Sequence, residues 1–146
     1  MDQFTITKPC DMHVHLRDGD MLKAVAPFTA RHFYRAVVMP NLTPPVRTAA
    51  DVSAYYERIL EAAGSDSNFS PLMTFKILPD TDPASIEDLA ALDYVVGGKV
   101  YPKNLTTNAQ DGVDDFFALR NVFSVMQDHR LVLCLHGEMP GDHIMG

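Results

Sequence analysis

Residues 72–101 read LMTFKILPDTDPASIEDLAALDYVVGGKVY, and this stretch contains the pattern strand, helix, strand. The run Leu72–Leu78 is almost entirely apolar, which is typical of a buried strand. Asp82 followed by Pro83 predicts a helix start, because proline at the first helical position gives up an N–H that has no partner there. The helix should run to about Leu92. A unit of this kind joins two parallel strands.

The same alternation extends outward in both directions. Thr48 and Asp51 have the spacing of a capping box, and the helix that they begin should end at Gly64. The strand at 94–101 should be interrupted by Gly97-Gly98. The other expected elements are extended segments at 6–7 and 12–16, a helix at 21–30, a strand at 36–39, a helix at 116–126 and a strand at 131–136.

About five strands alternating with about four helices predict an α/β fold with a parallel sheet. Doubly wound sheets and (β/α)₈ barrels share this signature. A full barrel needs ~250 residues, and the chain has 146, so it has room for about half of one. The last strand, Leu131–Leu135 with His136, is nearly continuous in apolar residues, which suits a sheet covered on both faces.

Composition and charge exclude several classes of partner. The net charge is −7 and no basic run is present, which argues against nucleic acid and anionic membranes but not against a small anionic substrate. The longest apolar stretch, Leu131–Leu135, is far shorter than the ~20 residues of a bilayer span. The start of the chain lacks the features of a secretory signal. Cys10 and Cys134 are expected to be buried free thiols in a reducing cytoplasm.

Two histidines spaced two residues apart give the strongest local signal for chemistry. His13 and His15 end an expected strand, in which residues i and i+2 point to the same face. Two imidazoles on one face can bind a metal ion from the same side. The pair could instead face solvent or pack into the core. The polar loop that begins at Arg17 favours the metal interpretation.

Lys99 is a second candidate, because it ends a strand that is otherwise apolar. Burial lowers the pKa of a lysine, and the neutral amine can react with carbon dioxide to form a carbamate. A carbamate is an anionic oxygen ligand that two neighbouring metal ions would stabilise. Gly97 and Gly98 would leave room beside it. The residues alone favour a simpler interpretation, in which the stem of Lys99 follows the sheet and its amine reaches solvent.

Further polar residues stand where expected strands end. His136 closes the last strand, and such folds place their sites at the carboxyl ends of parallel strands. Arg17 and Asn41 follow earlier strands, and a guanidinium with an amide suits recognition of a carboxylate. Thr106 and Thr107 lie in a polar loop long enough to act as a lid. Taken singly, each would more often be an ordinary loop residue.

Five ordered motifs together resemble the dihydroorotase family, the pyrimidine-pathway branch of the amidohydrolase superfamily, in its single-chain bacterial type. The similarity extends to about Glu138 and implies a partial (β/α)₈ TIM barrel with about the first five strands. It also implies that residues 1–146 are the N-terminal part of the barrel domain. The motifs are HVHLRDGDMLK at 13–23, VMPNLTPPV at 38–46, GKVYP at 98–102, TTNAQDGV at 106–113 and HGE at 136–138.

The resemblance implies a role for each candidate residue. Two zinc ions would be bridged by the carbamate of Lys99, formed from carbon dioxide, and Arg17 with Asn41 would hold a substrate carboxylate. The implied metal ligands are His13, His15, Lys99 and His136. The implied substrate-binding residues are His15, Arg17, Asn41, Thr106, Thr107 and His136.

The implied reaction is the reversible, zinc-dependent cyclisation of N-carbamoyl-L-aspartate to (S)-dihydroorotate in pyrimidine biosynthesis, in the cytoplasm and by a family that forms homodimers. In the family, an Asp on the last barrel strand carries the proton, and a further His ligand comes from the sixth strand. The 146 residues contain neither segment, so we expect the isolated chain to be inactive. Asp142 and His143 have the right chemistry but lie in a tail that does not match the family.

Two other functions remain open on the sequence. Another cyclic amidase of the superfamily would act on hydantoins or dihydropyrimidines, whereas the pair Arg17 and Asn41 favours a substrate with a carboxylate. A non-catalytic metal-binding or assembly fragment would explain the absence of the proton-carrying Asp. Turnover by this chain, compared with turnover by a longer one, separates the two classes.

Overall fold

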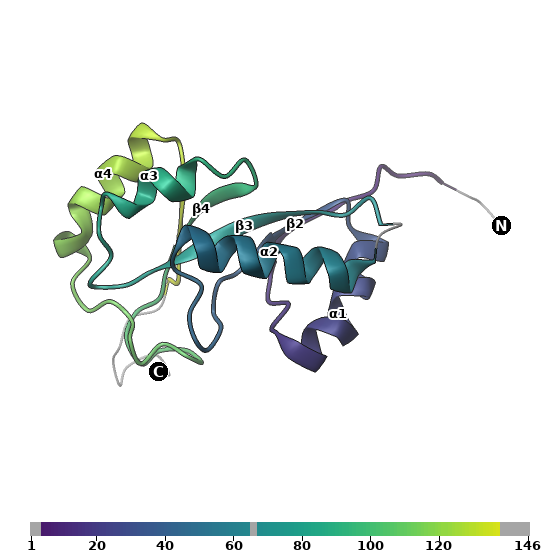
Figure 1. Ribbon diagram of the computed structural model, residues 1–146, viewed down its shortest axis with the longest axis horizontal. Coiled ribbons are helices and arrows are strands. Elements are labelled where there is room, and N and C mark those ends of the chain that lie inside the picture. The colour runs from purple at the N-terminus through teal and green to yellow at the C-terminus, as the bar shows by residue number, and fades with distance from the viewer. Residues whose placement is uncertain (1–3, 65–66, 138–146) are drawn as a thin grey trace.

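Five parallel strands form one sheet within residues 4–64 and 67–137, which the computed structural model describes (Figure 1). Strand order in the sheet follows chain order, from β1 to β5. A doubly wound sheet reverses its order at a switch point, and this sheet does not. The curled sheet with helices between its strands is therefore a partial TIM barrel, as predicted. The strands are β1 (Cys10–Val14), β2 (Arg35–Val38), β3 (Ser70–Ile77), β4 (Val95–Val100) and β5 (Val132–Leu135).

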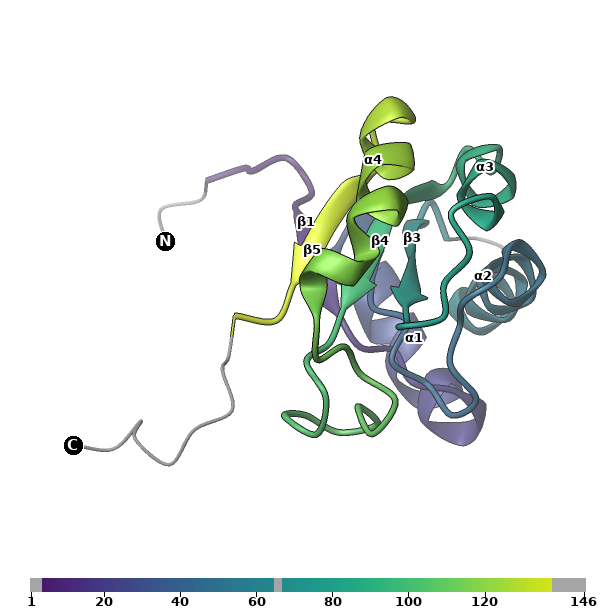
Figure 2. The same ribbon diagram turned by 90° about the vertical axis from the view of Figure 1, so that its left-hand side faces the viewer.

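The helices cover one face of the sheet, as right-handed crossovers between sequential parallel strands require (Figure 2). Phe75 and Ile77 of β3 and Tyr55 and Ile59 of α2 are fully buried in the core between these layers. Burial of each such side chain stabilises the fold by about 1.5–3 kcal/mol. The helices are α1 (Gly19–His32), α2 (Ala49–Ala63), α3 (Ser85–Ala90) and α4 (Arg120–Asp128), with a 3₁₀ turn, η1 (Phe116–Leu119), before α4.

The opposite face of the sheet is the inner face of the partial barrel. Side chains alternate along a strand, so Lys76 lies on the face opposite to the core residue Phe75. Lys76 on β3 is in register with Lys99 on β4, and Lys99 is in register with Cys134 on β5. Register partners in a parallel sheet point to the same side. The inner face therefore carries two lysines and a thiol.

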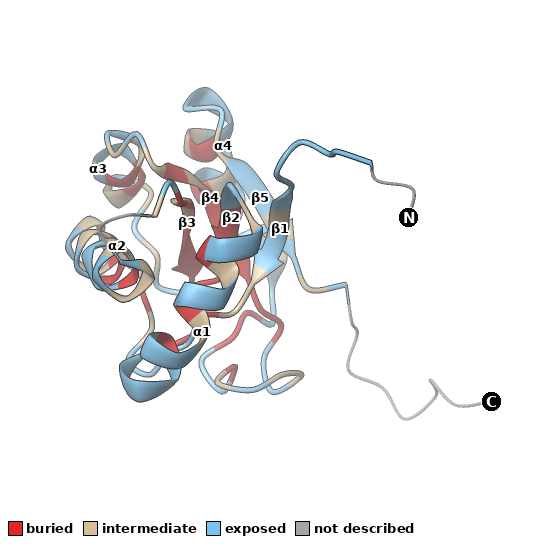
Figure 3. Cartoon of the chain, turned by 90° about the vertical axis from the view of Figure 1, so that its right-hand side faces the viewer, coloured by how far each residue is buried: buried red, intermediate tan, exposed pale blue. Residues whose placement is uncertain are grey.

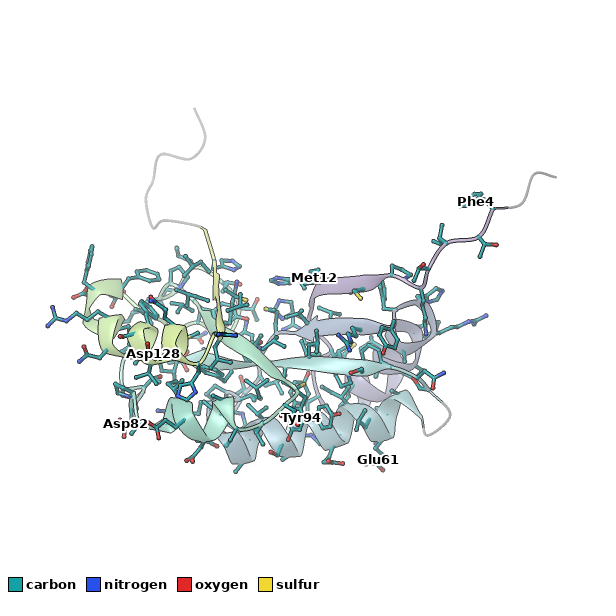
Figure 4. All side chains as sticks on the ribbon, turned by 90° about the horizontal axis from the view of Figure 1, so that it is seen from above. Phe4, Met12, Glu61, Asp82, Tyr94 and Asp128 are labelled. Atoms are coloured by element: carbon teal, nitrogen blue, oxygen red, sulfur yellow. The ribbon has the colours of Figure 1, made fainter. Side chains whose placement is uncertain are left out.

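The two edge strands are exposed, which corrects the expectation that the last strand is covered on both faces. Figure 3 colours β1 and β5 mostly as exposed, and Val132 and Leu135 are 58% and 55% exposed. Met12 on β1 is 69% exposed, and it lies across the strands from Glu61 of α2 (Figure 4). Each edge strand has a hydrogen-bonded neighbour on one side only among the described residues.

Local signals predicted the helices with varying success. The capping box of Thr48 and Asp51 is present, and Gly64 ends α2 as predicted. Asp82 accepts a hydrogen bond from the backbone N–H of Ala84, so it caps a turn that precedes the short helix α3. The extended segment expected at 6–7 is not a strand, because β1 begins at Cys10.

The described residues also test the expectations about the two cysteines and about membrane-spanning helices. Cys10 and Cys134 are free, but Cys10 is exposed and Cys134 only half-buried, so the prediction of buried thiols was wrong. Both residues lie on edge strands, and Cys134 points to the inner face of the sheet, away from the layer of helices. None of the helices in the described part of the chain is long and apolar enough to cross a bilayer.

The glycine pair lies inside β4 and does not interrupt it, which corrects another expectation. A Cβ on Gly97 would stand 2.1 Å from the carbonyl oxygen of Val132, and one on Gly98 would meet the rings and methyls of Phe75 and Ile77 within 3 Å. The glycines therefore admit the neighbouring strand and the core. The sequence had suggested that the two glycines leave room beside Lys99, but the space next to them is filled by these atoms.

We expect Gly97→Ala to lower the free energy of unfolding by at least about 1–3 kcal/mol, because the clash is with backbone and cannot be relieved by a rotamer change. Denaturant unfolding followed by circular dichroism measures the loss. Gly137→Ala is the control, since a Cβ there meets nothing within 4 Å. Equal stability of the two variants would contradict the close approach of β4 and β5.

Candidate functional site

The two histidines at the end of β1 face one another. The Nε2 atoms of His13 and His15 lie 3.3 Å apart, and their ring planes are tilted by 57°. The Asp11 carboxylate accepts a hydrogen bond from the backbone N–H of His13 at 2.9 Å, which fixes the strand end. The prediction that both imidazoles share one side is confirmed. Their nitrogens converge as two ligands of one ion would.

Electrostatics keep both imidazoles neutral. Burial lowers the pKa of His15 to about 4, and the positive charge of Arg17 acts in the same direction. Burial, followed by the charge of Lys99, also lowers the pKa of His13. A neutral imidazole has a free lone pair on one ring nitrogen. At neutral pH this pair can therefore accept a metal ion without first losing protons.

Lys99 is buried on the inner face, which overturns the simpler interpretation that its amine reaches solvent. Its side chain is 2% exposed, and its Nζ donates a hydrogen bond to the carbonyl of Leu135 at 2.9 Å. Burial lowers the pKa of Lys99. The neighbouring strand β5 covers the lysine. The apolar residues around Lys99 in the sequence therefore reflect the burial of β4. A larger fraction of neutral, nucleophilic amine is the chemical consequence.

Tyr101 connects Lys99 to His136. The ring centroid of Tyr101 lies 5.3 Å from Lys99 Nζ and 5.8 Å from the ring centroid of His136. The charge of His136 contributes to the lowered pKa of both His13 and His15. The tyrosine is 1% exposed, and its hydroxyl has no hydrogen-bond partner among the described residues. Sequence analysis noticed Tyr101 only as part of a motif and gave it no role.

Arg17 has a backbone conformation that residues other than glycine rarely adopt. Its φ is +61°, and the hydroxyl of Tyr55 donates a hydrogen bond to its carbonyl at 2.8 Å. Such a left-handed residue costs about 1–3 kcal/mol and is enriched at functional sites. The surrounding contacts therefore hold Arg17 against its own preference, immediately after the histidine pair.

Asn41 is buried and is bonded to the long loop after β4. The side chain is 3% exposed, and its Nδ2 donates to the carbonyl of Thr107 at 2.6 Å. Its Oδ1 has no partner among the described residues. The sequence predicted a carboxylate-binding residue at this position. The structure adds that the amide already contacts the loop of Thr106 and Thr107.

A second buried lysine was missed by sequence analysis. Lys76 on β3 is 1% exposed and donates hydrogen bonds to the carbonyl of Asn108 and to Asp111, at 2.8 and 2.5 Å. The signal that singled out Lys99, a lysine in an apolar strand, applies equally to Lys76. No motif around Lys76 suggested chemistry, and its partners lie more than thirty residues away.

The donor set suits a zinc ion in part. His13 and His15 present two neutral nitrogens, and the buried Lys99 amine and the unpartnered hydroxyl of Tyr101 stand on the same inner face. Within the described ranges, no three His, Cys, Asp or Glu side chains gather into one metal-binding group. The charge of His136 reaches both histidines, but His136 does not gather with them into a metal-binding group of three in the described part of the chain. A zinc ion usually needs three or four ligands.

Comparisons with known proteins give one family model and curated relatives that match most of the chain. Residues 8–144 match the model of the amidohydrolase family. The chain is 52% identical over 139 residues to a dihydroorotase of Ruegeria and 48% identical over 143 residues to one of Picosynechococcus. These alignments cover 95% and 98% of the chain. The chain spans about 40% of the length of these curated relatives.

Two solved structures that superimpose well on this chain are also dihydroorotases. A dihydroorotase of Campylobacter jejuni superimposes with a TM-score of 0.85 at 41% identity, over 94% of this chain and 40% of its own. A yeast dihydroorotase in complex with 5-fluoroorotic acid has a TM-score of 0.85 at 39% identity, over 92% and 37%. An L-hydantoinase of Arthrobacter aurescens shares the fold, with a TM-score of 0.67 at 19% identity, over 90% and 29%.

Proposed function

Because the chain belongs to the amidohydrolase family, we propose that it forms the N-terminal part of a zinc-dependent dihydroorotase. The complete protein would catalyse the reversible cyclisation of N-carbamoyl-L-aspartate to (S)-dihydroorotate in pyrimidine biosynthesis. One observation carries the proposal: a converging pair of neutral histidines lies on the same inner face as a buried lysine, in a chain 52% identical to a dihydroorotase. The same resemblance favours a cytoplasmic homodimer.

The residues that would hold the metal are His13, His15, the carbamate of Lys99 and His136. When bound, zinc would act as a Lewis acid and would lower the pKa of a water molecule at the site. The contribution of this chain is to keep the imidazoles neutral and the amine buried. The amine of Lys99 now donates to the carbonyl of Leu135, so carbamate formation would require that hydrogen bond to be released.

The substrate side would consist of Arg17, Asn41 and the threonines of the loop. The guanidinium of Arg17 can bind a carboxylate through two parallel hydrogen bonds. Asn41 would add an amide donor, and Thr106 and Thr107 would add hydroxyl donors from above. In the hydrolytic direction water adds to the ring amide carbonyl, the C–N bond breaks, and the nitrogen leaves with a proton. In the family, the carboxylate that carries this proton lies on the last barrel strand.

The test uses a completed protein, in which residues 1–137 of this chain are joined to the part of the Ruegeria dihydroorotase that follows the matching segment. Carbamoyl-aspartate formed from dihydroorotate is measured by mass spectrometry, and an uncharged hydantoin is the competing substrate. We expect turnover of dihydroorotate and little of the hydantoin. A preference for the hydantoin would replace this proposal with the other cyclic amidase, and zinc binding without turnover of either would favour an assembly role.

In the completed protein, Arg17→Met should weaken substrate binding while zinc content stays near that of the parent. Charge-assisted hydrogen bonds are worth roughly 1.5–3 kcal/mol, so KM for dihydroorotate should rise by about tenfold or more. Steady-state kinetics and elemental analysis of the same sample give the two quantities. Loss of zinc in this variant would show that Arg17 supports the metal site and would contradict the division of roles.

A further inference from the structure

Lys76 contacts the loop that carries Thr106 and Thr107. A buried ammonium group is tolerated only where its charge is paired and its hydrogen bonds are satisfied. Lys76 is 1% exposed, and both partners named for its Nζ, the carbonyl of Asn108 and the carboxylate of Asp111, belong to this loop. The loop therefore supplies what the buried charge needs, and the charge in turn holds the loop.

The rest of the loop is held at two further points. Its neck closes where Val113 donates to the carbonyl of Tyr101 at 2.8 Å, and a Cβ on Gly112 would stand 2.6 Å from that same oxygen. Near the tip, Asn41 donates to the carbonyl of Thr107. Asn41, from the segment that follows β2, and Lys76, from β3, thus bind the consecutive carbonyls of Thr107 and Asn108.

The loop backbone takes a left-handed conformation at the second of these carbonyl-bearing residues. Asn108 has a φ of +57°, in the left-handed region that asparagine adopts more readily than most residues. Lys76 reaches the loop from the carboxyl half of β3, in register with Lys99. Its side chain lies on the inner face beside the predicted metal ligand, yet its charge is directed to Asp111.

We propose that Lys76 is a positioning residue: its buried ammonium anchors the loop of residues 103–113 through Asn108 and Asp111, and this anchor holds Thr106 and Thr107 over the carboxyl ends of the strands. The effect on substrate rests on the proposed function. The anchoring itself does not, because it follows from the contacts of Lys76 alone.

Hydrogen–deuterium exchange on the 146-residue chain tests the anchoring. We expect amides of residues 104–111 to exchange about tenfold faster or more in Lys76→Met and in Asp111→Asn, since a hydrogen-bonded charge pair is lost. Asp111 is 43% exposed, so its variant should keep the fold if Lys76→Met does not. Asp114→Asn is the matched control, because it removes the exposed ion pair of Lys103 at the same loop. Unchanged exchange in Asp111→Asn would overturn the proposal.

Kinetics of the completed protein test the positioning. Asp111→Asn should raise KM for dihydroorotate by about tenfold while kcat and zinc content change little, and Asp111→Glu should restore KM. A purely structural ion pair would lower the active fraction and kcat but leave KM unchanged. Faster exchange without a change in KM would therefore overturn the positioning role. A completed protein that does not turn over dihydroorotate would contradict the proposed function, and the exchange measurement would still decide the anchoring.

Discussion

The isolated 146-residue chain should not convert dihydroorotate, whereas the completed protein should. In the family, the proton-carrying Asp and one zinc-binding His lie beyond the fifth strand, and this chain spans about 40% of its relatives' length. A positioned acid–base group contributes ~10²–10⁴ in rate, and the missing ligand adds to that loss. Carbamoyl-aspartate formation, compared at equal concentrations of the two proteins, measures the difference.

The same chain should exist in solution with its edges covered by another copy. Met12, Val132 and Leu135 on the edge strands are all more than half exposed, and an unpaired, apolar strand edge promotes association. Sedimentation or light scattering gives the oligomeric mass. A monomeric chain that binds two zinc ions and turns over dihydroorotate at an ordinary rate would refute the expectation, and would direct attention to Asp142 or His143.

Lys99→Ala in the completed protein should abolish activity and metal binding together. The carbamate would be a shared ligand of both zinc ions, so alanine removes a bond to each, and metal chemistry worth several kcal/mol is lost. We expect kcat to fall by about 10³-fold or more and zinc per chain to fall with it. A short carboxylic acid in the buffer should restore part of both, because it can replace the carbamate oxygens.

Lys23→Ala is the matched control for this variant. Lys23 lies on α1 with a side chain that is 76% exposed, and its ion pair with Asp20 is on the surface. Its removal should change neither zinc content nor kcat. If Lys99→Ala kept its zinc and lost only activity, Lys99 would act on substrate and would not bridge the metal ions.

The polar residues at strand ends show how far sequence reasoning reached. His13 and His15 were predicted to share one side because a strand alternates its side chains, and their nitrogens lie 3.3 Å apart. Lys99 was harder, because an apolar strand with one lysine fits both a buried amine and a solvent-reaching one. The choice depends on whether β5 covers the lysine, and that contact joins residues 36 apart in the chain.

Lys76 and Asn41 show what local patterns could not reveal. Each makes its decisive contact with a loop 32 to 66 residues away. The role of the glycines of β4 likewise depends on the atoms of Val132 and Phe75 that approach them, which the sequence does not reveal. In each case the interaction energy comes from a neighbour in space, about which residue type and spacing carry no information.

The alternation of strands and helices, the capping of α2 and the family motifs could be predicted from the residues, because these features depend on hydrophobic period, local hydrogen bonds and residue order. Three features came from the folded structure alone: the glycines of β4 admit β5 and the core, Lys99 is buried, and Lys76 contacts the loop of Thr106 and Thr107. Those outcomes depend on desolvation and on close packing between distant segments. Both quantities are set by the folded arrangement, since a side chain loses its water only when another part of the chain covers it.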